Sequence, residues 1–140
     1  MILLDTNVIS ELMRAEPAQI VLDWFGQHEA ASLFISAVTE AELRTGVAIL
    51  PEGQRRDRLQ LAIDAMIDQD FQSRVLPFDS LAAKAYAKIS ARRRAAGRPI
   101  AEADCQIAAI AGAKDAPIAT RNVKDFDGCG VRVINPWNAD

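Results

Sequence analysis

The 140-residue chain is long enough for one compact domain, 1–140, which can bury roughly two thirds of its unfolded surface without a disulfide or a metal ion. Half of the residues are hydrophobic and a quarter are charged, a composition typical of globular proteins that excludes a disordered tail. We expect neither a signal peptide nor a membrane span, so a membrane protein is excluded as well. The net charge of −3 is unevenly distributed along the chain. Residues 1–70 carry −7, from five Lys and Arg against twelve Asp and Glu, and residues 71–140 carry +4, from eleven Lys and Arg against seven Asp and Glu. A uniformly basic surface for nucleic acid is therefore excluded.

The first half of the chain alternates short apolar runs, typical of buried strands, with apolar residues at helical spacing. The first run, 2–4, ends at Asp5, and a helical pattern follows it at once. Pro17 opens a second helical stretch, and Gly26 ends it. In chain order we therefore expect a strand at 2–4, a helix after Asp5, a helix at 17–26, a strand at 33–35 and a helix from about 38 to 50.

The second half continues the alternation after a break at 51–53. A strand candidate at 75–78 is weakened by Pro77, because proline cannot donate a hydrogen bond to a neighbouring strand. Asp79 or Ser80 can cap the long helix that follows. We expect helices from 54 to about 69, from 80 to about 96 and from 102 to 114, and strands at 118–120 and 131–134.

Apolar strands without polar alternation, interleaved with helices, are typical of a parallel sheet that is covered on both faces. We therefore predict a single α/β domain with a central, mainly parallel sheet flanked by helices. In such sheets, ligands bind outside the carboxyl ends of the strands, near the point where the strand order reverses. Polar residues that directly follow a strand are therefore candidates for a functional site.

The single histidine, His28, excludes most histidine-based catalysis, including histidine-rich zinc sites and paired acid–base histidines. The two cysteines, Cys105 and Cys129, are too few for a secreted disulfide scaffold and favour a reduced, cytoplasmic protein. Cys105 as a thiol nucleophile is an alternative without a histidine nearby in the sequence to activate it. If the chain is an enzyme, carboxylates must carry most of its chemistry.

Acidic and amide side chains follow two of the predicted strands. Asp5 follows the first strand, and Asn122 and Asp125 follow the strand that ends at Thr120, so the ends of both strands supply polar groups to one edge of the sheet. The structural alternative for Asp5 is a helix N-cap, in which its carboxylate accepts backbone N–H groups. Three adjacent polar residues at 5–7 exceed what a single cap requires.

Two predicted helices carry further acids. Glu40 and Glu42 point roughly 200° apart on a helix, so at most one of them can face the sheet edge. Glu42 could instead form a capping box with Thr39, which stands three residues before it. Asp104 lies in the first turn of a very apolar helix, where it either stabilises the helix dipole or belongs to a desolvated acidic site.

One metal-binding pocket would account for the whole set of acids. Carboxylate and amide oxygens suit hard cations such as Mg²⁺ or Mn²⁺. Such an ion lowers the pKa of a bound water and stabilises charge on a phosphoryl group, so it can drive phosphodiester hydrolysis without histidine.

Four segments of the sequence resemble the PIN-domain ribonucleases, and among these the VapC-type toxins of bacterial toxin–antitoxin pairs, in the branch that includes FitB. The segments occur in the order of the family and cover nearly the whole chain: ILLDTNVISE, TEAELRTG, EADCQIAAIA and IATRNVKDFDGCGVRVINPW. Each is weak alone, and jointly they are specific.

The resemblance implies roles by position. Asp5, Glu42 and Asp104 match the first three metal-binding acids of the family; we expect all three to be catalytic, with Asp5 and Asp104 as the metal ligands. The fourth catalytic position falls on Asn122, as a neutral ligand or a water-positioning group, or on Asp125. Supporting positions match three further residues: Thr6, Asn7 and Thr120.

The resemblance also implies partners. In such proteins Mg²⁺ or Mn²⁺ supports hydrolysis of RNA, a small antitoxin blocks the cleft with its C-terminal segment, the toxin forms a homodimer, and the pair binds operon DNA through the antitoxin only. A basic cluster at the end of a predicted helix could contact RNA phosphates or could compensate the helix dipole instead: Arg92, Arg93, Arg94 and Arg98.

Two other functions fit the same acids. A phosphoryl-transfer or phosphatase domain would use Asp5 as its nucleophile, although Asn7 stands where the phosphatase pattern has a second Asp. A non-catalytic module could keep the fold and bind only a partner protein, a possibility that Asn122 favours because an amide replaces a carboxylate there.

Overall fold

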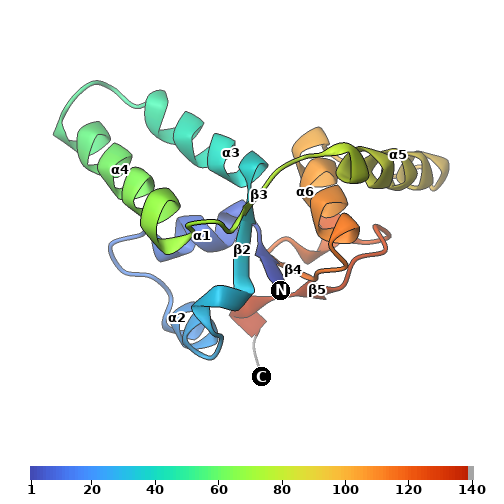
Figure 1. Ribbon diagram of the computed structural model, residues 1–140, viewed down its shortest axis with the longest axis horizontal. Helices are drawn as coiled ribbons and strands as arrows, with labels where there is room; N and C mark the ends of the chain where they lie inside the picture. The colour runs from blue at the N-terminus through green and yellow to red at the C-terminus, as the bar shows by residue number, and fades with distance from the viewer. Residues whose placement is uncertain (139–140) are drawn as a thin grey trace.

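The computed structural model describes residues 1–138, so the last two residues of the predicted domain lie outside the described part. Five parallel strands form one sheet in the order β3-β2-β1-β4-β5 (Figure 1). The strands are short: β1 Ile2–Leu4, β2 Leu33–Ser36, β3 Val75–Leu76, β4 Ile118–Ala119 and β5 Val133–Ile134. The predicted parallel α/β fold is therefore confirmed.

In the described part of the chain, six α-helices connect the strands: α1 Thr6–Leu12, α2 Gln19–Gly26, α3 Ala37–Ala48, α4 Gln54–Ala65, α5 Ser80–Ala95 and α6 Glu102–Ala113. The observed bounds of these helices agree with the bounds predicted from the sequence to within a few residues. The predicted helix 54–69 continues past α4 as a π-helical turn, Met66–Asp70. Short 3₁₀ helices stand at Ala30–Ser32 (η1), Val123–Phe126 (η3) and Pro136–Asn138 (η4).

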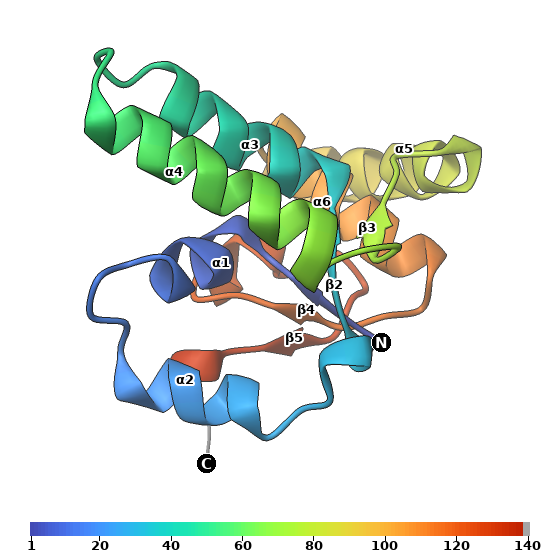
Figure 2. The same ribbon diagram turned by 60° about the vertical axis from the view of Figure 1, so that its left-hand side comes forward.

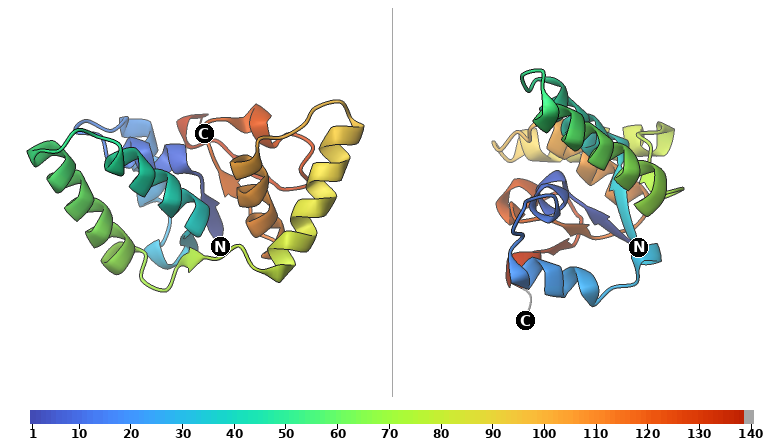
Figure 3. Two further views of the ribbon diagram at one scale, coloured as in Figure 1. Left: turned by 90° about the horizontal axis from the view of Figure 1, so that it is seen from above. Right: turned by 90° about the vertical axis from the view of Figure 1, so that its left-hand side faces the viewer.

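The core consists of two clusters, one on each face of the sheet. Neighbouring residues of a strand point to opposite faces, so Leu3 packs into the cluster that includes α5 and α6, whereas Leu4 packs into the cluster that includes α1 to α4. Both side chains are fully buried. Figure 2 shows α6 and α2 on opposite sides of β4 and β5, and Figure 3 shows the pair α3–α4 and the pair α5–α6 on either side of the strands.

The strand order reverses at β1. The chain proceeds from β1 to β2 and β3 on one side, and then returns to place β4 and β5 on the other side. The backbone N–H of Asp5 donates to the carbonyl of Ala119 at 2.9 Å, so the residues that follow β1 and β4 lie side by side. Parallel sheets bind ligands at such a switch point.

Within residues 1–138, no helix is both long enough and apolar enough to cross a membrane.

The amphipathic character of α4 yields a test with a matched control on the same helix. Ile63 is 1% exposed and Leu61 is 69% exposed. We expect Ile63→Ala to lower the free energy of unfolding by about 2–4 kcal/mol, because it leaves a cavity in the core. Leu61→Ala should change it by less than about 0.5 kcal/mol. Urea unfolding of both variants checks this, and equal losses would contradict the assigned packing of α4.

Candidate active site

Asp5 occupies the centre of the site, at the carboxyl end of β1. It is the N-cap of α1, and its Oδ1 accepts the backbone N–H of Thr6 at 2.8 Å. Its Oδ2 accepts the hydroxyl of Thr120 at 2.8 Å and the amide of Asn7 at 3.1 Å. The residue is 5% exposed. Asp5 is therefore a helix N-cap, as the structural alternative predicts. In addition, two side chains donate hydrogen bonds to its carboxylate.

Thr120 and Asn7 hold the two strand ends together. The Asn7 amide group donates to Thr120 Oγ1 at 3.0 Å as well as to Asp5, and its Oδ1 accepts the backbone N–H of Arg121 at 3.1 Å. Thr120 Oγ1 also accepts the backbone N–H of Asn122 at 3.0 Å. Both residues thus orient Asp5 and the segment that follows β4.

Glu42 reaches the site from α3 through Thr6. The Thr6 hydroxyl donates to Glu42 Oε1 at 2.7 Å, and it lies 3.0 Å from the hydroxyl of the buried Thr39. Because Thr6 has a single hydroxyl hydrogen, Thr39 is the donor in the second contact. The capping-box alternative for Glu42 is wrong: the N-cap of α3 is Ser36, whose side chain accepts the backbone N–H of Thr39.

Asp104 faces the site from the first turn of α6. Burial raises the pKa of its carboxyl group to about 6, and the negative charges of Asp5, Asp125 and Glu42 add to that shift. Burial also raises the pKa of Asp5, although the hydrogen bonds from Thr120 and Thr6 oppose the increase. Glu42 and Asp125 are therefore near enough for their negative charges to destabilise the charged forms of Asp5 and Asp104.

The two candidates for the fourth position differ in where they lie. Asn122 lines the same pocket as the three acids, whereas Asp125 does not. Asp125 acts at longer range, since its charge contributes to the raised pKa of Asp5 and of Asp104.

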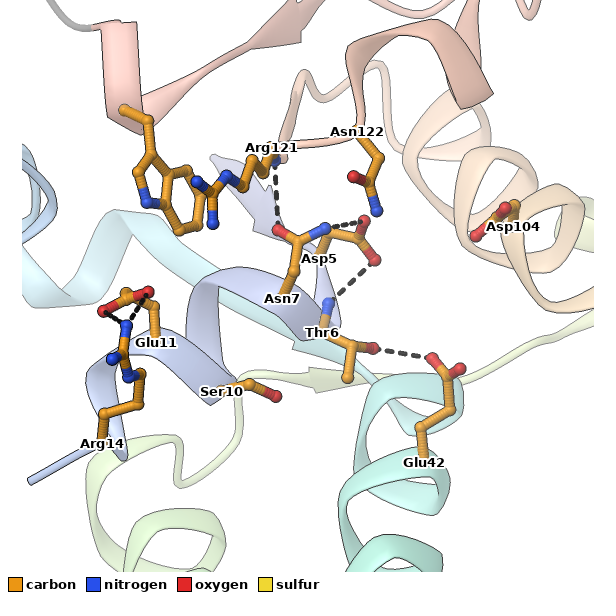
Figure 4. A pocket seen from close by; sticks show the side chains of 11 residues that line it. Asp5, Thr6, Asn7, Ser10, Glu11, Arg14, Glu42, Asp104, Arg121 and Asn122 are labelled. Carbon is orange, nitrogen blue, oxygen red and sulfur yellow. Dashed lines mark hydrogen bonds and ion pairs between the residues drawn. The ribbon is translucent and has the colours of Figure 1, made fainter. Parts of the chain in front are cut away.

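The pocket at this switch point has a volume of about 480 Å³. Figure 4 shows Asp104 and Glu42 on one side of Asp5, and Arg121, Glu11 and Arg14 on the other side. Further side chains complete its wall: Thr6, Asn7, Ser10, Asn122 and Trp137. The sequence interpretation missed Ser10, Glu11, Arg14, Arg121 and Trp137. For two of them the sequence did contain a signal, because Arg121 follows β4 and Trp137 follows β5, and residues after strand ends are candidates for the site.

The donor set fits a hard divalent cation. It consists of carboxylate and amide oxygens, and the repulsion between the acids is what such a cation relieves. Among residues 1–138, no three acidic, cysteine or histidine side chains converge closely enough to hold an ion alone. Mg²⁺ commonly takes one or two carboxylates and keeps several waters, so Asp5 and Asp104 are sufficient protein ligands.

The predicted basic cluster at the end of α5 is not one surface. Arg93 is buried, and its guanidinium donates to the carbonyls of Arg98, Asp125 and Asp127 at 2.6, 3.0 and 2.9 Å. Arg98 forms an ion pair with Asp127. Arg93 therefore anchors the loop that follows η3 and cannot contact RNA, which leaves Arg92 and Arg94 exposed.

Cys105 is buried beside Asp104, and burial raises the pKa of its thiol to about 11. A thiol of this kind is neutral at physiological pH, and it is a poor nucleophile. The thiol alternative therefore has no support in the geometry.

Comparisons with known proteins agree with the family resemblance of the sequence. The model of the family described as PIN domain matches residues 2–128. The plasmid stability protein StbB of Pseudomonas syringae pv. tomato is 48% identical over 99% of this chain and 100% of its own length. The VapC ribonuclease Y4jK of Sinorhizobium fredii is 44% identical over 98% of both chains. A solved structure of FitAB bound to a DNA fragment contains a chain with 40% identity and a TM-score of 0.94, covering 100% of this chain and 98% of that one.

The crowding of carboxylates has a consequence for stability. Folding raises the pKa of Asp104 from 3.8 to about 6, so the folded protein binds this proton more tightly than the unfolded chain does, and stability falls as pH rises through that interval. In EDTA at about pH 7, Asp104→Asn should raise the free energy of unfolding by about 1–2 kcal/mol, a value reduced for partial exposure. The gain should disappear near pH 4, because Asp104 is then protonated in the fold.

Urea unfolding of both proteins at the two pH values measures this difference. Glu16→Gln, an exposed acid between α1 and α2, is the control for the loss of a carboxylate. A gain that is equal at both pH values would contradict the role assigned to charge repulsion.

Proposed function

Because this chain belongs to the PIN-domain family, we propose that it is a ribonuclease toxin that hydrolyses RNA phosphodiester bonds with the help of a divalent metal ion. The observation that carries the proposal is the set of mutually repelling carboxylates at the switch point of the sheet, with the pKa of Asp104 raised to about 6. Acids with strongly perturbed pKa values in a pocket are typical of catalytic sites.

Different residues of the chain have different roles in such a site. Asp5 and Asp104 would hold the ion, and Thr120 and Asn7 fix the direction of the Asp5 oxygens through hydrogen bonds of 2.8 and 3.1 Å. The chemistry that a divalent ion such as Mg²⁺ or Mn²⁺ would supply there is to lower the pKa of a water molecule and to stabilise negative charge on the phosphate. Glu42, held by Thr6, and Asn122 orient water at the rim of the pocket.

The phosphoryl-transfer alternative is less well supported. Asn7 donates to Asp5 and cannot act as the second acid of a phosphatase. The non-catalytic alternative is countered by the acids themselves, since partner binding alone does not require three carboxylates around one pocket.

The relatives support the partners that we propose for this chain. The similarity to a VapC ribonuclease and to a chain of a FitAB complex supports a cytoplasmic toxin that is neutralised by a small antitoxin. The FitAB structure contains DNA, which supports contact with operon DNA through the antitoxin. We propose a homodimer on the family resemblance.

RNA cleavage tests the assignment of the acids. With Mg²⁺ or Mn²⁺ present, the purified chain should cleave single-stranded RNA, and Asp5→Asn and Asp104→Asn should each reduce the rate by at least roughly a hundredfold, because each removes a metal ligand. Asp57→Asn on α4 should cleave at the parent rate. A gel assay of labelled RNA with and without EDTA measures this, and full activity of Asp104→Asn would refute the proposed site.

Metal binding can be tested without activity. Mn²⁺ should raise the melting temperature of the parent, since a ligand that binds only the folded state stabilises it according to its concentration relative to Kd. The same titration should shift Asp104→Asn much less. Equal shifts in the two proteins would show that the ion binds elsewhere.

A further inference from the structure

The pocket extends well beyond the acids, and its far end has a different character. Figure 4 shows Arg121, Glu11 and Arg14 on the side of Asp5 that faces away from Asp104. Trp137 belongs to the same wall. The catalytic roles proposed above use none of these four residues.

Arg121 is held at both ends. Its backbone N–H donates to Asn7 Oδ1 at 3.1 Å, and Asn7 in turn donates to Asp5, so the position of Arg121 is tied to the centre of the site. The carbon of its guanidinium lies 5.1 Å from the centre of the Trp137 ring, which is a cation–π contact. Trp137 itself packs against the core cluster that includes Leu4.

Arg121 and Arg14 differ in how closely a carboxylate approaches their guanidinium groups. The nearly buried Glu11 carboxylate accepts two hydrogen bonds from Arg14, at 3.2 and 3.3 Å, so the charge of Arg14 is largely compensated. Among residues 1–138, no carboxylate lies within 4.0 Å of the Arg121 guanidinium, and the charge of Arg121 contributes, after that of Arg14, to the lowered pKa of Glu11. Stacking on Trp137 restrains the guanidinium and leaves its N–H donors available at the edge of the plane.

A polyanion needs such a cation here. The acidic side of the pocket repels phosphate groups, and nucleic-acid binding depends on cations that neutralise them. The basic cluster on α5 does not line the pocket, and Arg93 within it is buried. Arg121 is therefore the cation best placed to hold a nucleic-acid chain beside the acids.

We propose that Arg121, positioned by Trp137, binds a phosphate of the RNA strand next to the scissile phosphate. This inference rests on the proposed ribonuclease function and adds a substrate-binding subsite to it. The guanidinium donates two hydrogen bonds to the phosphate oxygens, which a lysine in its place could match in charge but not in geometry. Trp137 is a positioning residue that acts only through Arg121.

The test is the affinity for a short single-stranded RNA in EDTA, measured by fluorescence anisotropy between about 50 and 200 mM salt. Arg121→Gln should weaken binding about tenfold and reduce the slope of log K against log salt by about 0.7, the value for one lost phosphate contact on a single strand. Arg121→Lys should keep the slope and lose part of the affinity. Arg58→Gln, on the exposed face of α4, is the matched control and should match the parent.

Trp137 needs a readout that a merely structural role would not change. Trp137→Phe should retain most of the affinity, because an aromatic ring still supports the guanidinium, whereas Trp137→Ala should weaken binding. In the double variant with Arg121→Gln, the loss of Trp137 should have almost no additional effect, since the two residues act as one unit. Thermal unfolding identifies variants that have lost their fold. Additive losses in folded variants would overturn the role of Trp137.

The remaining outcomes are distinguishable. If the parent binds and cleaves RNA, and Arg121→Gln has the affinity and salt slope of Arg58→Gln, the subsite is refuted, and an acidic segment of a partner protein becomes the better ligand for Arg121. If the parent neither binds nor cleaves RNA, the proposed ribonuclease function itself fails.

Discussion

The burial of one carboxylate between two strand ends is the constraint on which the rest of the site depends. Asp5 can remain in this position only because Thr6, Asn7 and Thr120 supply three hydrogen-bond donors to it. Those donors come from both sides of the switch point, so the pairing of β1 with β4 and the geometry of the carboxylate require each other. The same network sets the path of the chain after β4, and thereby the positions of Arg121 and Asn122.

The electrostatics of the pocket follow from this arrangement. One side brings Asp104 and Glu42 toward Asp5, so its charges oppose folding in the absence of a cation. The other side brings Arg121 against an aromatic ring. A phosphodiester chain together with a divalent ion complements both sides at once, whereas a simple acidic or basic ligand complements only one. The free energy that the fold gives up to keep these like charges together is typical of sites retained for function.

The sequence predicted the fold well because each element depends on local periodicity. Short apolar runs and helical spacing sufficed for the sequence of strands and helices along the chain, and Asp5 at a strand end pointed to the edge of the sheet where the pocket lies. Contacts between distant residues were beyond such patterns. The true cap of α3 is Ser36, and Arg93 is buried because a loop 32 to 36 residues away folds over it, which no local pattern reveals. The opposite end of the pocket, with Arg121 on Trp137, became visible only in the assembled sheet.

The topology of the sheet also determines when the site can exist during synthesis. Asp5 and Thr120 are 115 residues apart, and β4 can pair with β1 only after most of the chain has been made. Contacts of such long sequence separation form late, since a large loop must close first. A nascent chain that ends before β4 has no Thr120 to hold Asp5 and no Arg121 beside it. The protein therefore cannot assemble its pocket on an incomplete chain, and translation itself delays the appearance of any activity that the pocket has.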